Sequence, residues 1–194
     1  MEDFDTYNKS SDEIYKTFSE EERSAIDALD AKKSFQKGYV LISEGQYFKT
    51  SFHVLSGLVR EFRIVDGVEI TSNFYTKDQF INISNSTSSH KASAFTLICM
   101  EDSMLSVVSF EKEKEMYKQF PRFEKMCRIN SEKQLNAFQD KFSKFISSTP
   151  EERYKTLLKE RPDLLNRVPQ YHLSSYLGIT PESLSRIRKR LVEK

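Results

Sequence analysis

The chain has 194 residues, of which 38% are hydrophobic and 30% are charged, and its formal net charge at pH 7 is +1. These proportions are sufficient for a packed core and exclude a wholly disordered chain. No apolar run approaches the roughly 18 residues that a membrane-spanning helix needs, and the acidic, polar N-terminus lacks the pattern of a signal peptide. We therefore expect a cytoplasmic protein with no membrane partner.

The small net charge hides an asymmetry between the two ends of the chain. Residues 150–194 carry ten basic and six acidic side chains, whereas residues 1–149 carry 20 basic and 23 acidic ones. A basic region on an otherwise nearly neutral protein is typical of one local polyanion-binding surface.

The cysteines and histidines do not indicate a metal centre or catalysis. Cys99 and Cys127 lie far apart in apolar surroundings, which favours free thiols over a disulfide. His53, His90 and His172 have no metal-ligand spacing with each other or with the cysteines. The sequence also has no nucleophile motif and no phosphate-binding glycine loop. We expect no metal, no cofactor and no catalytic residue, and therefore not an enzyme.

The first predicted element is a helical segment over residues 11–31, whose apolar side chains fall on one stripe. Ser19 followed by Glu22 has the spacing of a capping box, which predicts that a second helix begins there.

From residue 32 to residue 109 the pattern changes to short β-rich runs separated by Gly, Asp and Ser. The pair Asp66-Gly67 between two alternating runs predicts a β-hairpin. Short antiparallel strands at roughly ten-residue spacing are typical of a small barrel or jelly roll. The expected fold class is α+β.

Residues 111–148 are predicted to form one long helix, because turn formers are nearly absent after Pro121. Large apolar side chains recur at a 3–4 spacing in its second half, and their stripe either packs on the β-structure of the same chain or forms a coiled-coil-like dimer interface. The candidate interface residues are Leu135, Phe138, Phe142 and Phe145.

A boundary is expected at residues 147–150. Thr149 and Pro150 suit the N-cap and first position of a new helix, which should end near Arg161 because Pro162 follows.

The segment 170–191 has the pattern of a helix-turn-helix. Gly178 permits the positive backbone angle of a tight turn, and Thr180 and Pro181 suit the start of the second helix. Apolar residues occupy the inner positions of both helices, with a small residue where the helices approach each other. These positions are Leu173, Ser174, Leu177, Ile179, Leu184 and Ile187.

The outer face of the second helix carries charged and polar side chains. At 100° per residue, Glu182, Arg186 and Lys189 lie opposite the apolar face, whereas Arg188 falls near the inner face and is expected to bend away or to pair with a Glu. An Arg can bind guanine O6 and N7, and a carboxylate can accept from cytosine N4. The candidate DNA-binding residues are Tyr171, Thr180, Glu182, Ser183, Arg186, Lys189 and Arg190. The alternative interpretation is an ordinary helical hairpin with a solvated charged face.

The order of these elements resembles that of the Crp/Fnr superfamily of bacterial transcription regulators. The resemblance covers nearly the whole chain: "KGYVLISEGQ" (37–46) opens a β-roll, "FHVLSGLVREFRIVDGVEI" (52–70) forms a hairpin, and a long helix leads to the helix-turn-helix. The family's recognition helix carries a Glu and, four residues later, an Arg, which correspond here to Glu182 and Arg186. The resemblance implies a homodimer bound to a roughly palindromic DNA operator. The family's DNA-binding domain also carries a wing of the strand-turn-strand type, and the sequence near the motif shows no such pattern.

The resemblance also indicates where an effector would bind, and here the chain departs from the family. Family members that bind cyclic nucleotides carry Gly-Glu after a Phe and a later Arg-Ser or Arg-Thr, but this chain has Ile81-Asn82 and, instead of Arg, Lys91 before Ala92-Ser93. Lys cannot provide the bidentate geometry of Arg on a phosphate. We therefore do not expect cyclic AMP, and the cyclic-nucleotide-binding-like β-roll is expected to bind a different small effector or none.

The resulting prediction has three parts: a β-roll with N-terminal helices (1–110), a long dimerisation helix (111–148) and a helix-turn-helix domain (149–194). The predicted function is a dimeric, sequence-specific regulator of transcription that binds double-stranded DNA. The alternative is a ligand-sensing β-roll whose helical tail binds a protein partner.

Overall fold

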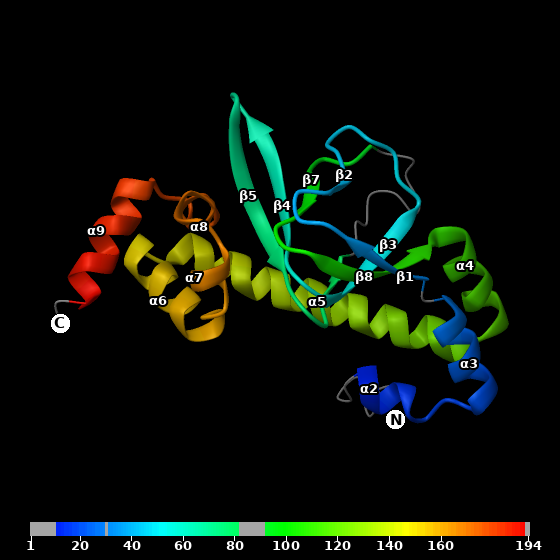
Figure 1. The fold of residues 1–194 in the computed structure, drawn as a ribbon. Helices are drawn as coiled ribbons and strands as arrows, with labels where there is room; N and C mark the ends of the chain where they lie inside the picture. Colours follow the sequence, from blue (N-terminus) through cyan, green and yellow to red (C-terminus); the bar gives the residue numbers. More distant parts are fainter. Residues whose placement is uncertain (1–10, 30, 82–91, 193–194) are drawn as a thin grey trace.

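The computed structural model describes residues 11–29, 31–81 and 92–192 of the chain. Figure 1 shows a β-roll beside the long helix α5 (Pro121–Ser147), with the N-terminal helices near one end of α5 and the C-terminal helices at the other. The architecture is α+β with antiparallel sheets, as the sequence predicted. Within the described ranges, no helix has both the length and the apolar character to cross a bilayer.

Residues 11–29 form two helices, α2 (Ser11–Tyr15) and α3 (Glu20–Leu29). The predicted capping box is confirmed: the main-chain N–H of Ser19 donates to Glu22 at 2.7 Å, and that of Glu22 donates to the Ser19 hydroxyl at 3.1 Å. The apolar side of this segment packs against the helices that follow the β-roll, in a cluster formed by Ile14, Phe18, Met116, Phe123 and Met126.

The β-roll consists of two four-stranded antiparallel sheets with the strand orders β1-β8-β3-β6 and β2-β7-β4-β5. Its core lies between the sheets, where Val54, Ile81, Leu97 and Leu105 are fully buried. The strands are β1 (Ala31–Phe35), β2 (Val40–Ile42), β3 (Thr50–Ser56), β4 (Val59–Val65), β5 (Val68–Tyr75), β6 (Phe80–Ile81), β7 (Thr96–Cys99) and β8 (Ser103–Ser109).

The hairpin between β4 and β5 turns at Asp66-Gly67, as predicted. Both residues have positive φ, +51° and +79°, which is the geometry of the two-residue turns that match the twist of a hairpin. The turn pairs Val65 with Val68 directly across the hairpin. Since β5 has a neighbour on one side only, its outer edge is available for contact with other elements.

The predicted single helix over 111–148 is wrong in one respect, because the structure has two helices there. Helix α4 (Phe110–Gln119) ends before Phe120, whose φ of −128° and ψ of 86° are not helical, and α5 begins at Pro121. A proline disfavours the helical conformation of the preceding residue and cannot continue a helix. The spacing of apolar residues placed Phe120 on a stripe that continues through this position, which suggested one helix. In the structure, Pro121 starts a new helix.

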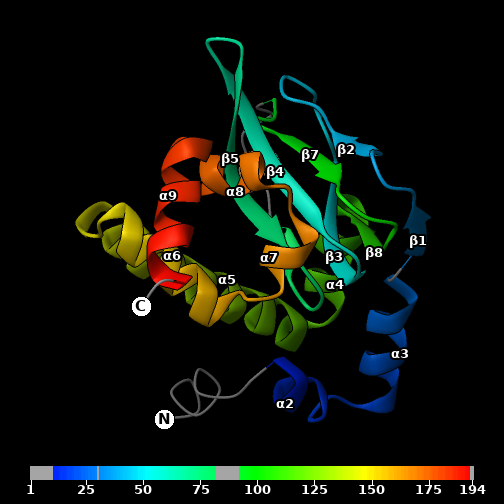
Figure 2. The ribbon, with the colours of Figure 1, turned by 60° about the vertical axis from the view of Figure 1, so that its left-hand side comes forward.

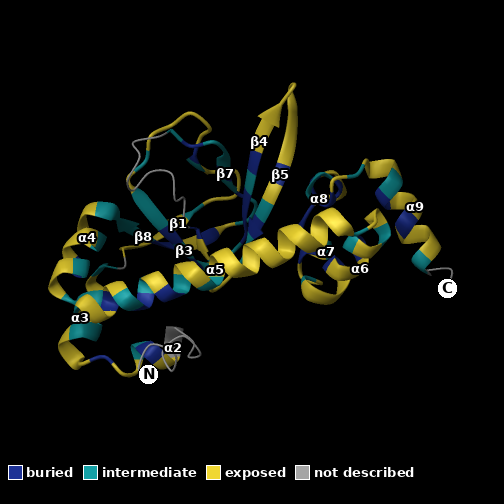
Figure 3. Ribbon diagram, turned by 180° about the vertical axis from the view of Figure 1, so that it is seen from behind, coloured by how far each residue is buried: buried dark blue, intermediate teal, exposed yellow. Residues whose placement is uncertain are grey.

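Helix α5 buries one face in its first half and is exposed in its second half (Figure 3). Phe123, Met126 and Ile129 are buried, whereas the large side chains of the predicted stripe face solvent in the described chain. Packing of the stripe on the β-roll of the same chain, which was one of the two alternatives, is therefore not observed.

Four helices follow: α6 (Pro150–Glu160), α7 (Leu164–Arg167), α8 (Gln170–Leu177) and α9 (Pro181–Val192). Thr149 caps α6 with a complete capping box to Glu152, and the helix ends before Arg161, as predicted. Residues 110–192 contain helices and no strand, so this part of the chain has no strand-built wing.

The C-terminal helices share their core with one edge of the β-roll. Leu58 and Phe74 from the β-roll belong to the same buried cluster as Leu164, Leu173 and Leu184. Helix α8 packs on β5, and the two elements lie side by side in Figures 1 and 2. The helix-turn-helix is therefore packed against the β-roll and not only tethered to it.

Candidate nucleic-acid interface

The turn between α8 and α9 is built as the sequence predicted. Gly178 is left-handed at φ +66°, and its N–H bonds to the carbonyls at the end of α8. A side chain at this position would adopt a rarely populated backbone conformation, and its Cβ would also lie 3.2 Å from atoms of Arg153 and Phe145. The apolar residues expected on the inner faces are buried or partly buried, and Ser174 is 1% exposed at the approach of the helices.

Helix α9 presents its polar face to solvent. The Thr180 hydroxyl accepts from the N–H of Ser183 at 3.2 Å and caps the helix. Leu184 and Ile187, on the inner face of α9, are buried. Of the seven residues predicted to bind DNA, Ser183 is partly buried and the others are exposed. Arg188 is also exposed, so its predicted position near the inner face does not bury it.

The exposed face of α9 carries an ionised carboxylate, that of Glu182, among basic side chains. The pKa of Glu182 lies below its usual range, chiefly because its own backbone N–H and then the Thr180 hydroxyl donate to the carboxylate. Arg186 lies one turn later, and its Nε donates to the carbonyl of Glu182 at 3.4 Å. An ionised Glu and an Arg on adjacent turns can accept from one base edge and donate to the next.

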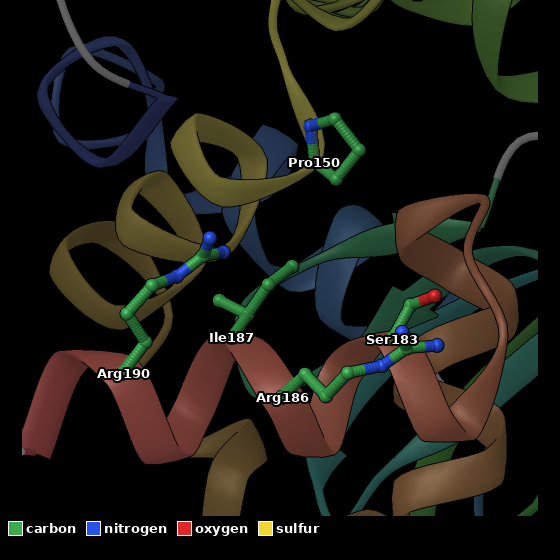
Figure 4. A pocket seen from close by; sticks show the side chains of 5 residues that line it. All are labelled: Pro150, Ser183, Arg186, Ile187 and Arg190. Atoms are coloured by element: carbon green, nitrogen blue, oxygen red, sulfur yellow. The ribbon is translucent and has the colours of Figure 1, made fainter.

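A recess of about 390 Å³ lies between the inner side of this face and the start of α6 (Figure 4). Two arginines of α9, Arg186 and Arg190, extend along it, and Pro150 closes the opposite wall. Arg190 forms an ion pair with Glu151 at 3.1 Å. The recess therefore presents guanidinium groups, which suit an anion such as a phosphate.

The stripe predicted as a dimer interface is a continuous exposed apolar surface on α5. Phe138 is 63% exposed and Phe142 is 56% exposed, and their rings stack with centroids 6.1 Å apart. Leu135 and Ile146 extend the stripe at its two ends. Phe145 lies at its boundary, because the guanidinium of Arg153 covers its ring at 4.4 Å.

The residues expected to line an effector pocket are only partly described. Ile81 is fully buried in β6, and Asn82 and Lys91 lie outside the described residues. Ala92 is partly buried, and Ser93 is 3% exposed with its hydroxyl donating to the carbonyl of Phe95 at 2.6 Å.

The two cysteines are free thiols, and Cys99 is buried. Burial raises the pKa of the Cys127 thiol to about 12, which keeps it protonated and unreactive. In the part of the chain that the structure describes, no three His, Cys, Asp or Glu side chains gather as metal ligands.

Sequence reasoning missed the contacts that join α7 and α8 to the β-roll. Arg167 bonds both carboxylate oxygens of Glu101, at 2.8 and 2.6 Å, and the carbonyl of Gly57 at 2.8 Å. Arg60, a buried arginine of β4, bonds His172 of α8. No local pattern in the sequence signals these contacts, because the partners lie 66 and 112 positions apart.

Comparisons with known proteins support the architecture. No family model matches the chain, and no curated protein matches its sequence. Among solved structures, the catabolite activator protein of Thermus thermophilus is 17% identical with a TM-score of 0.57, and the match covers 93% of this chain and 86% of that one. FixK2 of Bradyrhizobium japonicum is 17% identical with a TM-score of 0.70, covering 84% and 85%. CLP of Xanthomonas campestris is 16% identical with a TM-score of 0.70, covering 90% and 92%.

These neighbours define the class of fold to which the structure corresponds. The chain has the fold of the Crp/Fnr regulators, in which an N-terminal β-roll is joined by a long helix to a C-terminal helix-turn-helix. The fold resemblance that the sequence suggested is therefore confirmed over most of the chain.

Proposed function

We propose that the protein is a dimeric, sequence-specific DNA-binding regulator of transcription and not an enzyme. The observation that carries this proposal is the second helix of the helix-turn-helix. Its apolar face is buried, its glycine turn fixes its orientation, and Glu182, Arg186 and Lys189 face solvent together. This arrangement is what a recognition helix needs in order to enter a major groove.

In this proposal the residues of the face have separate roles. Arg186 binds the O6 and N7 atoms of a guanine, and Glu182 accepts from a cytosine N4 in the adjacent pair. Ser183 lies beside them on the first turn of α9. Phosphate contacts set the position of the protein without reading the sequence, and we assign them to Tyr171, Thr180, Lys189 and Arg190.

Dimerisation uses the apolar stripe of α5, with Leu135, Phe138, Phe142 and Phe145. A stripe of this kind facing water is unfavourable, and a second copy of the same helix would bury it. A two-fold dimer brings two identical recognition helices to one duplex, so the operator is expected to be roughly palindromic.

The β-roll is assigned an effector other than cyclic AMP, or a scaffold role without an effector. Candidate contacts are Ile81, Asn82, Lys91, Ala92 and Ser93. The absence of an Arg in the stretch from Lys91 to Ser93 removes the bidentate partner that a cyclic phosphate needs.

The test is DNA binding by the purified full-length protein, with the operator first selected from random duplexes. Arg186→Ala should weaken binding to the selected duplex by about 1–3 kcal/mol, or about 5- to 150-fold. Arg63→Ala removes a positive charge from the exposed end of β4 and should leave the dissociation constant unchanged. Equal binding by wild type and Arg186→Ala would show that the recognition-helix assignment is wrong.

Salt dependence separates this function from the alternative in which the helical tail binds a protein. Phosphate contacts release counterions, so the dissociation constant for DNA should rise steeply between 50 and 200 mM salt, by orders of magnitude if about six phosphates are contacted. Failure to retain any duplex even at low salt would instead favour a protein partner for the exposed face of α9.

A further inference from the structure

Arg60 is a charged side chain buried between the β4–β5 hairpin and α8. It is 3% exposed, and its guanidinium lies 2.5 Å from a carboxylate oxygen of Glu69 and 3.3 Å from the Thr71 hydroxyl. Its Nη1 also donates to Nδ1 of His172 in α8, and its Cζ stacks 4.1 Å from the ring centroid of Phe62. A guanidinium cannot lose its charge, so burial has to be balanced by partners such as these.

The histidine in this contact acts as an acceptor. Burial, and then the positive charge of Arg60, lower the pKa of His172 to about 4, so the imidazole is neutral near pH 7. A neutral ring that accepts at Nδ1 carries its proton on Nε2. Arg60 therefore joins its own hairpin, through Glu69 and Thr71, to the helix-turn-helix, through His172.

A second pair of hydrogen bonds joins the β4–β5 hairpin to α8, through main-chain atoms of β5. The N–H of Thr71 donates to the hydroxyl of Ser175 in α8 at 2.9 Å, and that hydroxyl donates to the carbonyl of Glu69 at 3.1 Å. Because β5 is an edge strand, these backbone groups have no neighbouring strand to bond. Ser175 takes the place of that neighbour and fixes where α8 lies along β5. We refer to the bonds among Arg60, Glu69, Thr71, His172 and Ser175 as the docking contact.

Together with the Arg167 contacts and the shared apolar core, the docking contact sets an orientation that the chain connection leaves open. Between α5 and α6 the backbone is extended at Ser148, with φ −95° and ψ 144°, so no continuous helix carries the direction of α5 into the helix-turn-helix. The contact leaves the outer face of α9 free, since Glu182, Arg186 and Lys189 remain exposed. The docked arrangement therefore leaves the proposed DNA-binding face of α9 exposed to solvent.

We propose that Arg60 and His172 are positioning residues for DNA binding. They hold α8, and through the glycine turn α9, at one angle to α5, so that two copies of α9 in a dimer match the spacing of two half-sites. This inference rests on the proposed function. A different docking angle would leave the buried charge of Arg60 without its partner on α8, which is costly, so the contact selects one arrangement among several possible ones.

The experiment compares two duplexes, one with both half-sites of the selected operator and one with a single half-site. Arg60→Met should weaken binding to the two-site duplex by about tenfold or more, because the two helices no longer engage together, and should change single-site binding by less than about twofold. Arg63→Met, three residues along the same strand on its exposed part, is the matched control and should change neither constant. Ser175→Ala should show the same selective loss, and it provides a second test should Arg60→Met fail to fold.

Hydrogen exchange of the Thr71 amide measures docking without DNA. Arg60→Met and Ser175→Ala should speed this exchange, and Arg63→Met should not. Equal losses of affinity for both duplexes would mean that the substitutions only damage the helix-turn-helix. Unchanged dissociation constants for both duplexes would mean that Arg60 does not position it. Either result overturns the proposal. If the wild type binds neither duplex, the proposed function fails, and the positioning role fails with it. Unchanged Thr71 exchange overturns the docking contact alone.

Discussion

The guanidinium of Arg190 in α9 lies 3.1 Å from a carboxylate oxygen of Glu151 in the first turn of α6. The other oxygen of the same carboxylate lies 2.8 Å from the ammonium of Lys155. Arg190 is one of the residues assigned to DNA phosphates, so in free protein its charge is already partly neutralised. A phosphate that enters the recess beside Pro150 has to compete with Glu151 for this guanidinium.

Glu151→Gln is therefore expected to tighten DNA binding. Exposed ion pairs contribute about 0.2–1 kcal/mol, so removal of the competing carboxylate should lower the dissociation constant by up to about fivefold. Fluorescence anisotropy with a labelled operator duplex measures this change. Glu160→Gln removes the same charge from the other end of α6 and is the control for the general gain of positive charge. An equal gain in both variants would mean that Arg190 is not restrained by Glu151.

Gly57→Ala is expected to destabilise the protein more than Gly67→Ala does. Both glycines have positive φ, +97° and +79°, so each substitution carries a backbone cost of about 1 kcal/mol. A Cβ on Gly57 would also lie 2.7 Å from the Cα of buried Ser103, whereas nothing lies within 4 Å of a Cβ on Gly67. This overpacking should add about 1–3 kcal/mol to the loss of unfolding free energy.

Urea unfolding of both variants measures the difference. Gly57 also accepts a hydrogen bond from Arg167 of α7, so a shift of its backbone should loosen the C-terminal helices as well. Equal losses of unfolding free energy in the two variants would show that β8, which begins at Ser103, can shift to accommodate the added Cβ without destabilising the protein.

The local features of the fold could be predicted from sequence because each depends on neighbours within a few residues. The capping box at Ser19, the N-cap at Thr149, the Asp66-Gly67 turn and the glycine turn at Gly178 were all predicted and are all present. In each case the residue type itself supplies the needed bond or the needed backbone angle. The polar face of α9 follows in the same way from helical periodicity.

The docking of the helix-turn-helix could not be predicted, because it joins residues more than one hundred positions apart. Nothing in the spacing of Arg60 indicates that its partner is His172, and Ser175 looks like any polar helix residue. The break at Phe120 has a different cause. Pro121 gave the signal, but the apolar spacing on either side favoured a continuous helix, and a proline can also be tolerated in a kinked helix.

The docking contact should also make stability depend on pH. The pKa of His172 is lowered from 6.5 in an unperturbed side chain to about 4 by burial and by Arg60, while Glu69 opposes the shift. Between these two values the unfolded chain binds more protons than the folded one, so the stabilisation by neutral His172 is complete above pH 6.5 and is lost as the pH falls toward 4. The slope should not exceed about 1.4 kcal/mol per pH unit, the limit for one proton.

The measurement is the difference in unfolding free energy between wild type and His172→Gln across this pH range. Glutamine can accept from Arg60 but does not titrate, so subtraction removes the contributions of all other groups. The difference should become less favourable to the wild type as the pH falls from 6.5 to 4. A difference that does not change with pH would show that His172 is not buried as a neutral acceptor.

Phe142→Asp is expected to convert a dimer into a monomer. Phe138 and Phe142 stack on each other in the middle of the exposed stripe of α5, and a charge there would have to be buried in a helix-helix interface. Sedimentation equilibrium across a range of concentrations measures the molar mass. Ala137→Asp adds the same charge to the exposed surface of α5 away from the stripe, and it should leave the dimer intact. A dimer that survives Phe142→Asp and Phe138→Asp would place the interface elsewhere, and the recognition helices would then need another element to set their spacing.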